Sequence, residues 1–283
     1  QVTTEISEST NILDRSQTSE GLWTCDVIVS DGGAYDATKS VSTNIEAVEP
    51  CRSLEFDGID DQVEIPDSAL FSFGFQDFTI EAILYPYANC GDMYDYQCTY
   101  LSHSEGLGDL NKWSLNWSKH GYLEHLGHYM QIGGGQDRWL IQYPQSDFTS
   151  KWSHISYVRS NDVLYFYVNG EEVFREDYNT MMPNPNASLV IGGAENNRWF
   201  WGQIHAIRIS STARYLSDFG PFEQWEADAD TIALWNVFES AGTTLYDASE
   251  NEFHGVINGA SWTTSCPAED LDGMENTRAS RHV

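Results

Sequence analysis

Between residues 54 and 262 the sequence alternates short apolar stretches with glycine, asparagine and aspartate, and this spacing restricts the fold more than any other feature. No stretch keeps the 3.6-residue period of a helix over three turns. Asn169 and Gly170, after one such stretch, form the strongest short-range signal for a hairpin turn. Many short strands at such spacing predict a sandwich or barrel of antiparallel strands. The clearest stretches cover residues 78–84, 155–159, 163–168 and 188–191.

The composition is strongly acidic, with 43 aspartate and glutamate residues against 14 lysine and arginine residues and a net charge of −29. The sequence has no basic run that would neutralise the phosphates of a nucleic acid, so we expect no nucleic-acid partner. The same charge disfavours binding to an anionic membrane surface. Because no apolar run approaches the roughly 18 residues of a spanning helix, we also expect no membrane insertion.

The five cysteines include no Cys-x-x-Cys pair of the kind that indicates zinc or redox chemistry. Cys90 and Cys98 flank a short acidic loop that a disulfide could close. Cys51 and Cys266 flank the whole strand-rich region, as a bond joining the two ends of a domain would, and Cys25 is left over. The alternative is five buried free thiols. The acidic loop favours the disulfides, and with them an oxidising, extracellular compartment.

Residues 1–49 are polar and contain two alternating stretches, 22–29 and 40–45, which predict one β-hairpin. Two strands cannot bury a core by themselves. The order Trp-Thr-Cys-x-Val at 23–27, followed by an Asp-Gly turn, resembles the last third of a bacterial immunoglobulin-like domain. We therefore expect 1–49 to be the C-terminal fragment of such a domain. Because the chain starts at Gln1 without Met or a signal peptide, we expect it to be a piece of a longer protein.

A set of motifs occurs in a fixed order over the rest of the chain. They are Phe-Asp-Gly-x-Asp-Asp-x-Val at 56–63, Phe-Thr-Ile-Glu-Ala at 78–82, Trp-Ser-His-Ile at 152–155, Ile-Gly-Gly at 191–193, Phe-Trp-Gly-Gln-Ile at 200–204 and a Leu-Trp block at 233–262. This order resembles the laminin-G-like, concanavalin A-like jelly-roll domains of extracellular bacterial proteins. The resemblance implies an all-β, two-sheet antiparallel jelly roll, a fold that hosts lectins, glycoside hydrolases and structural spacers.

The Leu-Trp block opens the domain in most relatives of this type, whereas here it comes last. We interpret this order as a circular permutation that places the two ends of the domain side by side, which would also bring Cys51 near Cys266. The alternative is that the block begins a second, truncated jelly roll. The predicted organisation is an immunoglobulin-like fragment at 1–49, the jelly roll at 50–266 and a disordered tail at 267–283 with one calcium-repeat-like Asp-x-Asp-Gly unit.

Asp57, Asp60 and Asp61 lie in the turn after the first predicted strand of the jelly roll. Clustered carboxylates on a rim loop are the hard oxygen ligands that Ca²⁺ prefers, and the family resemblance also implies such an ion. These three residues are candidate ligands for a structural Ca²⁺, the alternative being a solvated acidic turn. Glu55, Asp57 and Asp60 are superficially similar to the Glu-x-Asp-x-x-Glu signature of laminarinase-type hydrolases. Because Gly58 interrupts the strand that would carry this signature, we predict no enzyme.

Two pairs of tryptophans are candidate ligand-binding residues. Phe200 stands where the resemblance implies a buried aromatic residue, so a regular strand turns Trp199 and Trp201 to the opposite face. Trp113 and Trp117 likewise share one face of another strand. Exposed aromatic faces stack on sugar rings, and we predict that these four tryptophans bind ligand. The alternative is that loops cover them.

Together these patterns predict a non-catalytic binding module that is secreted or displayed at a cell surface. The first hypothesis is a lectin-like module that binds carbohydrate, favoured by the aromatic excess and the acidic rim. The second is a module that binds a cell-surface protein or acts as a spacer in a tandem array, favoured by the immunoglobulin-like neighbour. A glycoside hydrolase of the same fold is the third, and it needs two carboxylates roughly 5–9.5 Å apart in a cleft.

Overall fold

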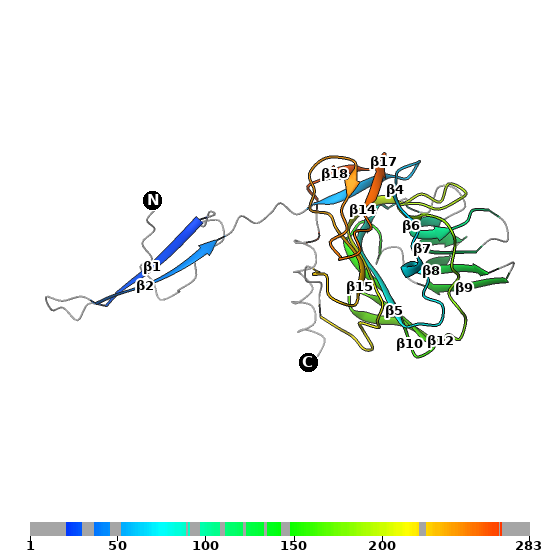
Figure 1. Ribbon diagram of the computed structural model, residues 1–283, viewed down its shortest axis with the longest axis horizontal. Coiled ribbons are helices and arrows are strands. Elements are labelled where there is room, and N and C mark those ends of the chain that lie inside the picture. The colour runs from blue at the N-terminus through cyan, green and yellow to red at the C-terminus, as the bar shows by residue number, and fades with distance from the viewer. Residues whose placement is uncertain are drawn as a thin grey trace. The chain divides into compact units, whose positions relative to one another are not determined.

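The chain forms two compact units, Gln1–Pro50 and Cys51–Val283, which Figure 1 shows as ribbons. The regular elements with described bounds are β-strands and one 3₁₀ helix, η2 (Ala69–Phe71). Among the described residues no helix is long and apolar enough to cross a membrane. The computed structural model describes residues 21–29, 37–45, 52–88, 90, 97–107, 111–120, 123–132, 135–142, 148–220, 225–265 and 267.

The first unit contains an antiparallel hairpin of β1 (Gly21–Val29) and β2 (Ala37–Ile45). Its register runs from Gly21 opposite Ile45 to Val29 opposite Ala37. This confirms the predicted hairpin, and both strands start slightly earlier than the sequence pattern predicted. The assignment of this hairpin to an immunoglobulin-like domain stays a prediction, and the side chain of Cys25 lies outside the described ones.

The second unit is built from two eight-stranded antiparallel sheets. The β5 sheet has the strand order β12-β11-β10-β5-β14-β3-β18, with β15 also paired to β14. Its strands are β3 (Ser53–Asp57), β5 (Phe78–Pro86), β10 (Ser153–Ser160), β11 (Val163–Val168), β12 (Glu171–Asp177), β14 (Trp201–Ser210), β15 (Thr231–Asn236) and β18 (Ser261–Thr263).

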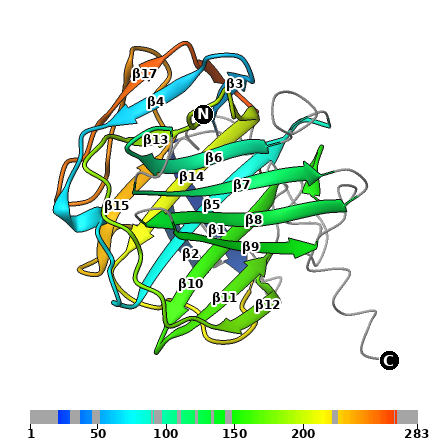
Figure 2. The ribbon, with the colours of Figure 1, turned by 90° about the vertical axis from the view of Figure 1, so that its right-hand side faces the viewer.

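The β6 sheet has the strand order β16-β17-β4-β13-β6-β7-β8-β9. In Figure 2 its strands β6 to β9 lie in front, and β5, β10 and β11 of the other sheet cross behind them. Its strands are β4 (Gln62–Ile65), β6 (Gln97–Ser104), β7 (Lys112–His120), β8 (Leu123–Ile132), β9 (Gly135–Gln142), β13 (Leu189–Ile191), β16 (Thr244–Leu245) and β17 (Gly255–Asn258).

The hydrophobic core lies between these two sheets. Phe56 and Ile80 of the β5 sheet and Leu101 and Trp113 of the β6 sheet belong to one buried cluster. Successive side chains of a strand point to opposite faces, so each sheet contributes every second residue to this core. The prediction of a two-sheet antiparallel sandwich is therefore confirmed.

The hairpin between β11 and β12 turns where the sequence predicted it. Asn169 and Gly170 both have positive φ angles, of 51° and 78°. Such angles characterise the two-residue turns that follow the right-handed twist of the flanking strands, and asparagine and glycine adopt them at the lowest cost.

The last strands of the unit pair with its first ones. β18 lies beside β3, β17 lies beside β4, and β15 lies beside β14. The Leu-Trp block thus belongs to the same two sheets as the Phe-Asp-Gly strand, and the two ends of the sandwich are neighbours. That this order arose by circular permutation stays a prediction.

One predicted disulfide is present, between Cys90 and Cys98, whose Cα atoms are 5.5 Å apart. The second predicted pair, Cys51 and Cys266, lies outside the described residues and stays a prediction. The predicted disordered tail at 267–283 also lies outside them, apart from Pro267.

Candidate functional site

Two of the four tryptophans predicted to bind ligand lie in the core instead. Trp113 and Trp117 are both 0% exposed. They share one face of β7, as the sequence indicated, but this face points toward the β5 sheet, and Leu115 between them is buried with them. The prediction of exposure was therefore wrong for this pair. Apolar and polar residues alternate along β7, a pattern that shows which residues share a face.

Phe200 lies inward, as predicted. It is 0% exposed and packs edge-on against Phe56, with ring centroids 6.0 Å apart. Trp199 and Trp201 on either side of it are both partly exposed. Because β14 begins at Trp201, Trp199 and Phe200 lie before the strand, and the Trp201 side chain packs against the core cluster that contains Phe200. The regular strand expected to turn both tryptophans to one outer face is therefore not present, and the two have different surroundings.

Trp201 begins β14 of the β5 sheet and packs over the turn that follows β3. A Cβ atom added at Gly58 would lie 2.8 Å from the Trp201 Cβ. Its indole meets the ring of Tyr87 edge-on, with centroids 6.0 Å apart. Its backbone N–H donates to the sulfurs of Cys90 and Cys98, at 3.4 and 3.5 Å. A role for Trp201 in ligand binding stays a prediction separate from that of Trp199.

Trp199 lies in the connection between β13 and β14 and lines a depression of about 270 Å³. Ser102 and Val190, which also line it, alternate with the buried Leu101 and Ile191, so the depression is on the outer face of the β6 sheet. This site will be called the Trp199 depression. Its lining residues are Gln62, Ser102, Ser104, Gly106, Ser188, Val190, Ala194, Glu195, Asn196, Asn197 and Trp199.

The indole of Trp199 has a fixed place at this site because it lies against Gly193. A Cβ atom at position 193 would approach the ring to 2.4 Å, closer than side-chain carbons come. The carbonyl of Gly193 accepts a 2.6 Å hydrogen bond from the Ser102 hydroxyl, which ties this backbone to β6. Glycine at 193 therefore lets the ring lie close to the sheet.

Glu195 supplies a fixed carboxylate at the Trp199 depression. Lys112 Nζ donates to Glu195 Oε1 at 2.8 Å, and the Ser104 hydroxyl donates to Oε2 at 2.8 Å. Lys112 also donates to the carbonyl of Gly106 at 2.7 Å. Burial raises the pKa of Glu195, but the bonds from Lys112 and Ser104 outweigh this effect and place the pKa below its ordinary value. Glu195 is therefore ionised at neutral pH.

Asn196 and Asn197 form the rim of the Trp199 depression. Both have positive φ angles, 67° and 58°, which cost free energy for residues other than glycine and are tolerated best by asparagine and aspartate. Both side chains are exposed. The site thus combines an aromatic face, two amides, several hydroxyls and one carboxylate, a set that can hold a polar ring by stacking and hydrogen bonding.

The sequence indicated only Trp199 among the lining residues. The others come from β4, β6, β13 and the connection after β13, segments that are far apart in the chain. The local signal for the rest of the site was the run Glu195, Asn196, Asn197 just before Trp199, where a polar loop precedes a partly exposed aromatic ring.

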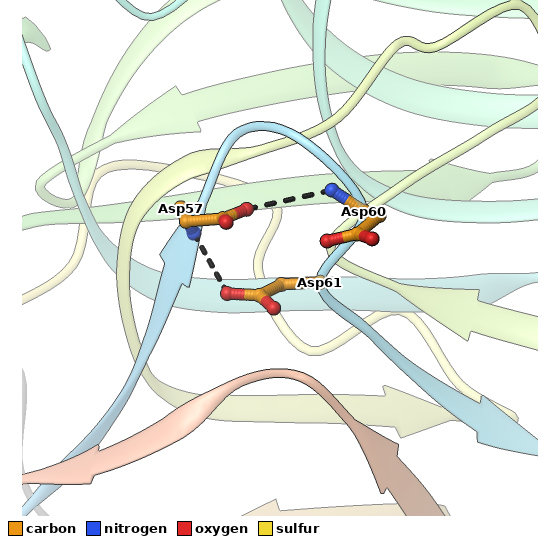
Figure 3. A group of neighbouring side chains, drawn as sticks. All are labelled: Asp57, Asp60 and Asp61. Carbon is orange, nitrogen blue, oxygen red and sulfur yellow. Dashed lines mark hydrogen bonds between the residues drawn. The ribbon is translucent and has the colours of Figure 1, made fainter.

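Asp57, Asp60 and Asp61 are brought together by the turn between β3 and β4, as Figure 3 shows. One ligand oxygen of each lies within 4.8 Å of those of the other two. The Asp57 N–H donates to Asp61 Oδ2 at 2.9 Å, and Asp57 Oδ1 accepts from the N–H groups of Ile59 and Asp60 at 2.8 and 3.4 Å. Partial burial, with the nearby charges of Asp57 and Asp60, raises the pKa of Asp61.

This arrangement fits a calcium ion in two respects. Oxygen ligands lie about 2.3–2.6 Å from Ca²⁺, so ligands on opposite sides of the ion are about 5 Å apart. A cation there would also offset the repulsion that raises the pKa of Asp61. The bonds described involve Oδ1 of Asp57 and Oδ2 of Asp61.

Comparison with known proteins agrees with this architecture. The family model for the concanavalin A-like lectin/glucanases superfamily matches residues 57–218, more than half of the chain. No curated protein matches the sequence. The structure of a candidate carbohydrate-binding protein from Bacteroides ovatus superposes with a TM-score of 0.56 at 17% identity, over 80% of this chain and 67% of that one.

Two further structures are more distant. Domain 4 of a GH43 extracellular arabinanase from Geobacillus stearothermophilus, in complex with arabinotriose, gives a TM-score of 0.41 at 18% identity, over 67% of this chain and 76% of its own. The CBM40 module of the Ruminococcus gnavus IT-sialidase gives 0.42 at 12% identity, over 57% of this chain and 92% of its own. The match of the family model, together with the two-sheet fold, shows that this chain belongs to the concanavalin A-like lectin/glucanase superfamily.

Proposed function

We propose that this chain is a non-catalytic, extracellular carbohydrate-binding module and that the Trp199 depression is its binding site. The observation that carries this proposal is the partly exposed indole of Trp199, held against Gly193 beside a fixed carboxylate and two exposed amides. A sugar ring has an apolar C–H face that stacks on an aromatic ring and an edge of hydroxyls that donate and accept hydrogen bonds. The lining of the depression offers partners for both.

The carboxylates of the site support binding without hydrolysis. Glycoside hydrolases generally place two carboxylates on either side of the scissile bond, one as the acid and the other as nucleophile or base. Among the described residues, Glu195 is the one carboxylate that lines the depression, and Lys112 and Ser104 occupy both of its oxygens. Glu55, part of the hydrolase-like signature, accepts a hydrogen bond from the Tyr87 hydroxyl at 2.6 Å.

The comparisons and the cysteines add independent support. The candidate carbohydrate-binding protein from Bacteroides ovatus shares this fold, although at 17% identity the likeness extends to the fold alone. The Cys90–Cys98 disulfide is the kind of bond that persists in oxidising compartments, which supports an extracellular location.

We also propose that the cluster of Asp57, Asp60 and Asp61 holds a structural Ca²⁺. Its support is the spacing of the three carboxylates and the position of the turn between β3 and β4, where an ion would join two strands of different sheets. In this proposal Ca²⁺ stabilises the rim and takes no part in a reaction.

A glycan array probed with the full 283-residue chain, in Ca²⁺ and in EDTA, tests the proposed function. We expect a restricted set of glycans to bind in Ca²⁺. Loss of these signals in EDTA would place the ion close to the ligand, whereas unchanged signals with a lower melting temperature would indicate a purely structural ion. No signal above background in either buffer would contradict carbohydrate binding and favour a protein-binding or spacer module.

A further inference from the structure

Charged groups are distributed unevenly around the Trp199 depression. Among the described residues that line it, Glu195 is the one charged side chain, and no lysine, arginine or histidine is part of that lining. The other lining side chains are amides, hydroxyls, small apolar groups and the indole. A ligand in the depression therefore meets a negative group directly and a positive group only behind it.

Two cations of the described residues are paired with that carboxylate. Lys112 Nζ lies 2.8 Å from Glu195 Oε1, and Arg198 NH1 lies 4.0 Å from the same oxygen. Both cationic side chains are mostly buried, and Lys112 donates in addition to Gly106. Their charges are thus largely neutralised before a ligand arrives.

Further carboxylates stand next to the site. Glu64 on β4 is exposed and lies opposite Val190, which lines the depression. Glu105 follows the lining residue Ser104, and the pKa of its carboxyl group is lowered, first of all by the backbone N–H of Asn186. The carboxyl group of Glu105 is therefore ionised at neutral pH, and the whole chain carries a net charge of −29. Beside the depression the carboxylates Glu64, Glu105 and Glu195 therefore outnumber the cations Lys112 and Arg198.

We infer that the Trp199 depression selects uncharged saccharides and rejects glycans that end in a sialic or uronic acid, with Glu195 as the residue that determines this specificity. The inference rests on the proposed function and narrows its ligand class. An anionic sugar would bring its carboxylate toward Glu195 without a free cation to meet it. A neutral sugar can instead donate its hydroxyls to the lone pairs of Glu195 that Lys112 and Ser104 leave open. Like charges brought together in a partly buried site weaken binding strongly.

The test uses an array on which each oligosaccharide is printed in a neutral and a sialylated form. We expect the wild-type chain to bind neutral forms at least about tenfold better than their sialylated counterparts. Raising the salt concentration from about 0.01 M to about 1 M shortens the electrostatic screening length roughly tenfold. The preference for neutral over sialylated forms should therefore decrease. This measurement uses the wild-type chain alone, so its result does not depend on whether a variant folds.

Glu195→Gln then tests the residue itself. Glutamine keeps the shape and an acceptor for Lys112 but removes the charge, so the Lys112 ammonium is no longer neutralised by a carboxylate. We expect the ratio of sialylated to neutral binding to rise at least about tenfold. Glu176→Gln is the matched control, because Glu176 is exposed on β12 of the other sheet and its replacement changes the net charge equally.

The outcomes separate this inference from the proposed function. Binding of sialylated forms as tightly as neutral ones would overturn the inference and leave carbohydrate binding intact. An equal change of the ratio in Glu195→Gln and Glu176→Gln would overturn the role of Glu195. Absence of binding to every printed glycan would overturn the proposed function, and the inference with it.

Discussion

The indole of Trp199 lies against Gly193 so closely that a Cβ atom at position 193 would be 2.4 Å from the ring. The aromatic surface of the proposed site therefore depends on a position with no side chain. Ser102 holds this glycine through a hydrogen bond to its carbonyl, so β6, the end of β13 and Trp199 act as one unit. Substitution of Gly193 moves the ring without removing it.

Gly193→Ala should weaken glycan binding because the new methyl group displaces the indole from the sheet. The ring is partly exposed and can shift outward, so the free energy of unfolding should fall by only about 1 kcal/mol. Gly220→Ala is the control, because a Cβ atom there meets nothing within 4 Å. Binding titrations and chemical denaturation of both variants check this, and equal affinities would contradict the placement of the ring.

Phe200 and Trp201 should respond differently to truncation. Phe200→Ala removes a fully buried ring and should cost about 3–5 kcal/mol of unfolding free energy. Trp201→Ala should cost less, because its ring is partly exposed, and should weaken glycan binding if Trp201 contacts the ligand as predicted. Chemical denaturation gives the stabilities. A larger loss of stability in Trp201→Ala than in Phe200→Ala would show that the faces are reversed.

How much the sequence could predict depends on how local each feature is. The Asn169–Gly170 turn is set by neighbours in the chain, and it was predicted. Trp113 and Trp117 are an even number of positions apart, which showed that they share a face of their strand. Which face of the strand is inward depends on the opposite sheet.

The lining of the Trp199 depression depends on contacts between segments that are far apart in the sequence. Val190 lies beside Glu64 on one side and Ser102 on the other, so the register of β13 with β4 and β6 decides which side chains meet there. No spacing within a single segment records that register.

Acid should destabilise the sandwich through Glu81, which is 1% exposed on β5. Arg208 Nε donates to one of its oxygens at 2.7 Å, and His154 and the Tyr215 hydroxyl bond the other at 2.9 and 3.0 Å. Burial raises the pKa of Glu81, but the bonds from His154 and Arg208 outweigh it and leave the pKa below its ordinary value of 4.5.

A carboxylate with a lowered pKa in the folded state stabilises that state above its unfolded pKa, and this contribution is lost as the pH falls through the folded value. We therefore expect the melting temperature to fall as the pH drops below about 4.5. Glu81→Gln should lower stability at neutral pH by about 3–5 kcal/mol, because Arg208 is left buried without its carboxylate, and should weaken the acid dependence. An unchanged acid dependence in Glu81→Gln would contradict this role.

Calcium should raise thermal stability if the cluster of Asp57, Asp60 and Asp61 binds it. An ion that binds only the folded state at about 100 times its dissociation constant adds about 2.7 kcal/mol. Asp60→Asn should abolish the difference in melting temperature between millimolar Ca²⁺ and EDTA. Asp177→Asn, on an exposed part of β12, should retain it. Identical melting temperatures of the wild-type chain in the two buffers would exclude the ion.

The central claim is that Trp199 forms the sugar-stacking surface of a carbohydrate site. Its most direct test is isothermal titration calorimetry of the wild-type chain and Trp199→Ala with the neutral glycan that gives the strongest array signal. We expect saturable binding by the wild type and an affinity at least about tenfold lower in the variant, equivalent to about 1.4 kcal/mol, with little change in melting temperature. Equal affinities in two folded proteins would contradict it.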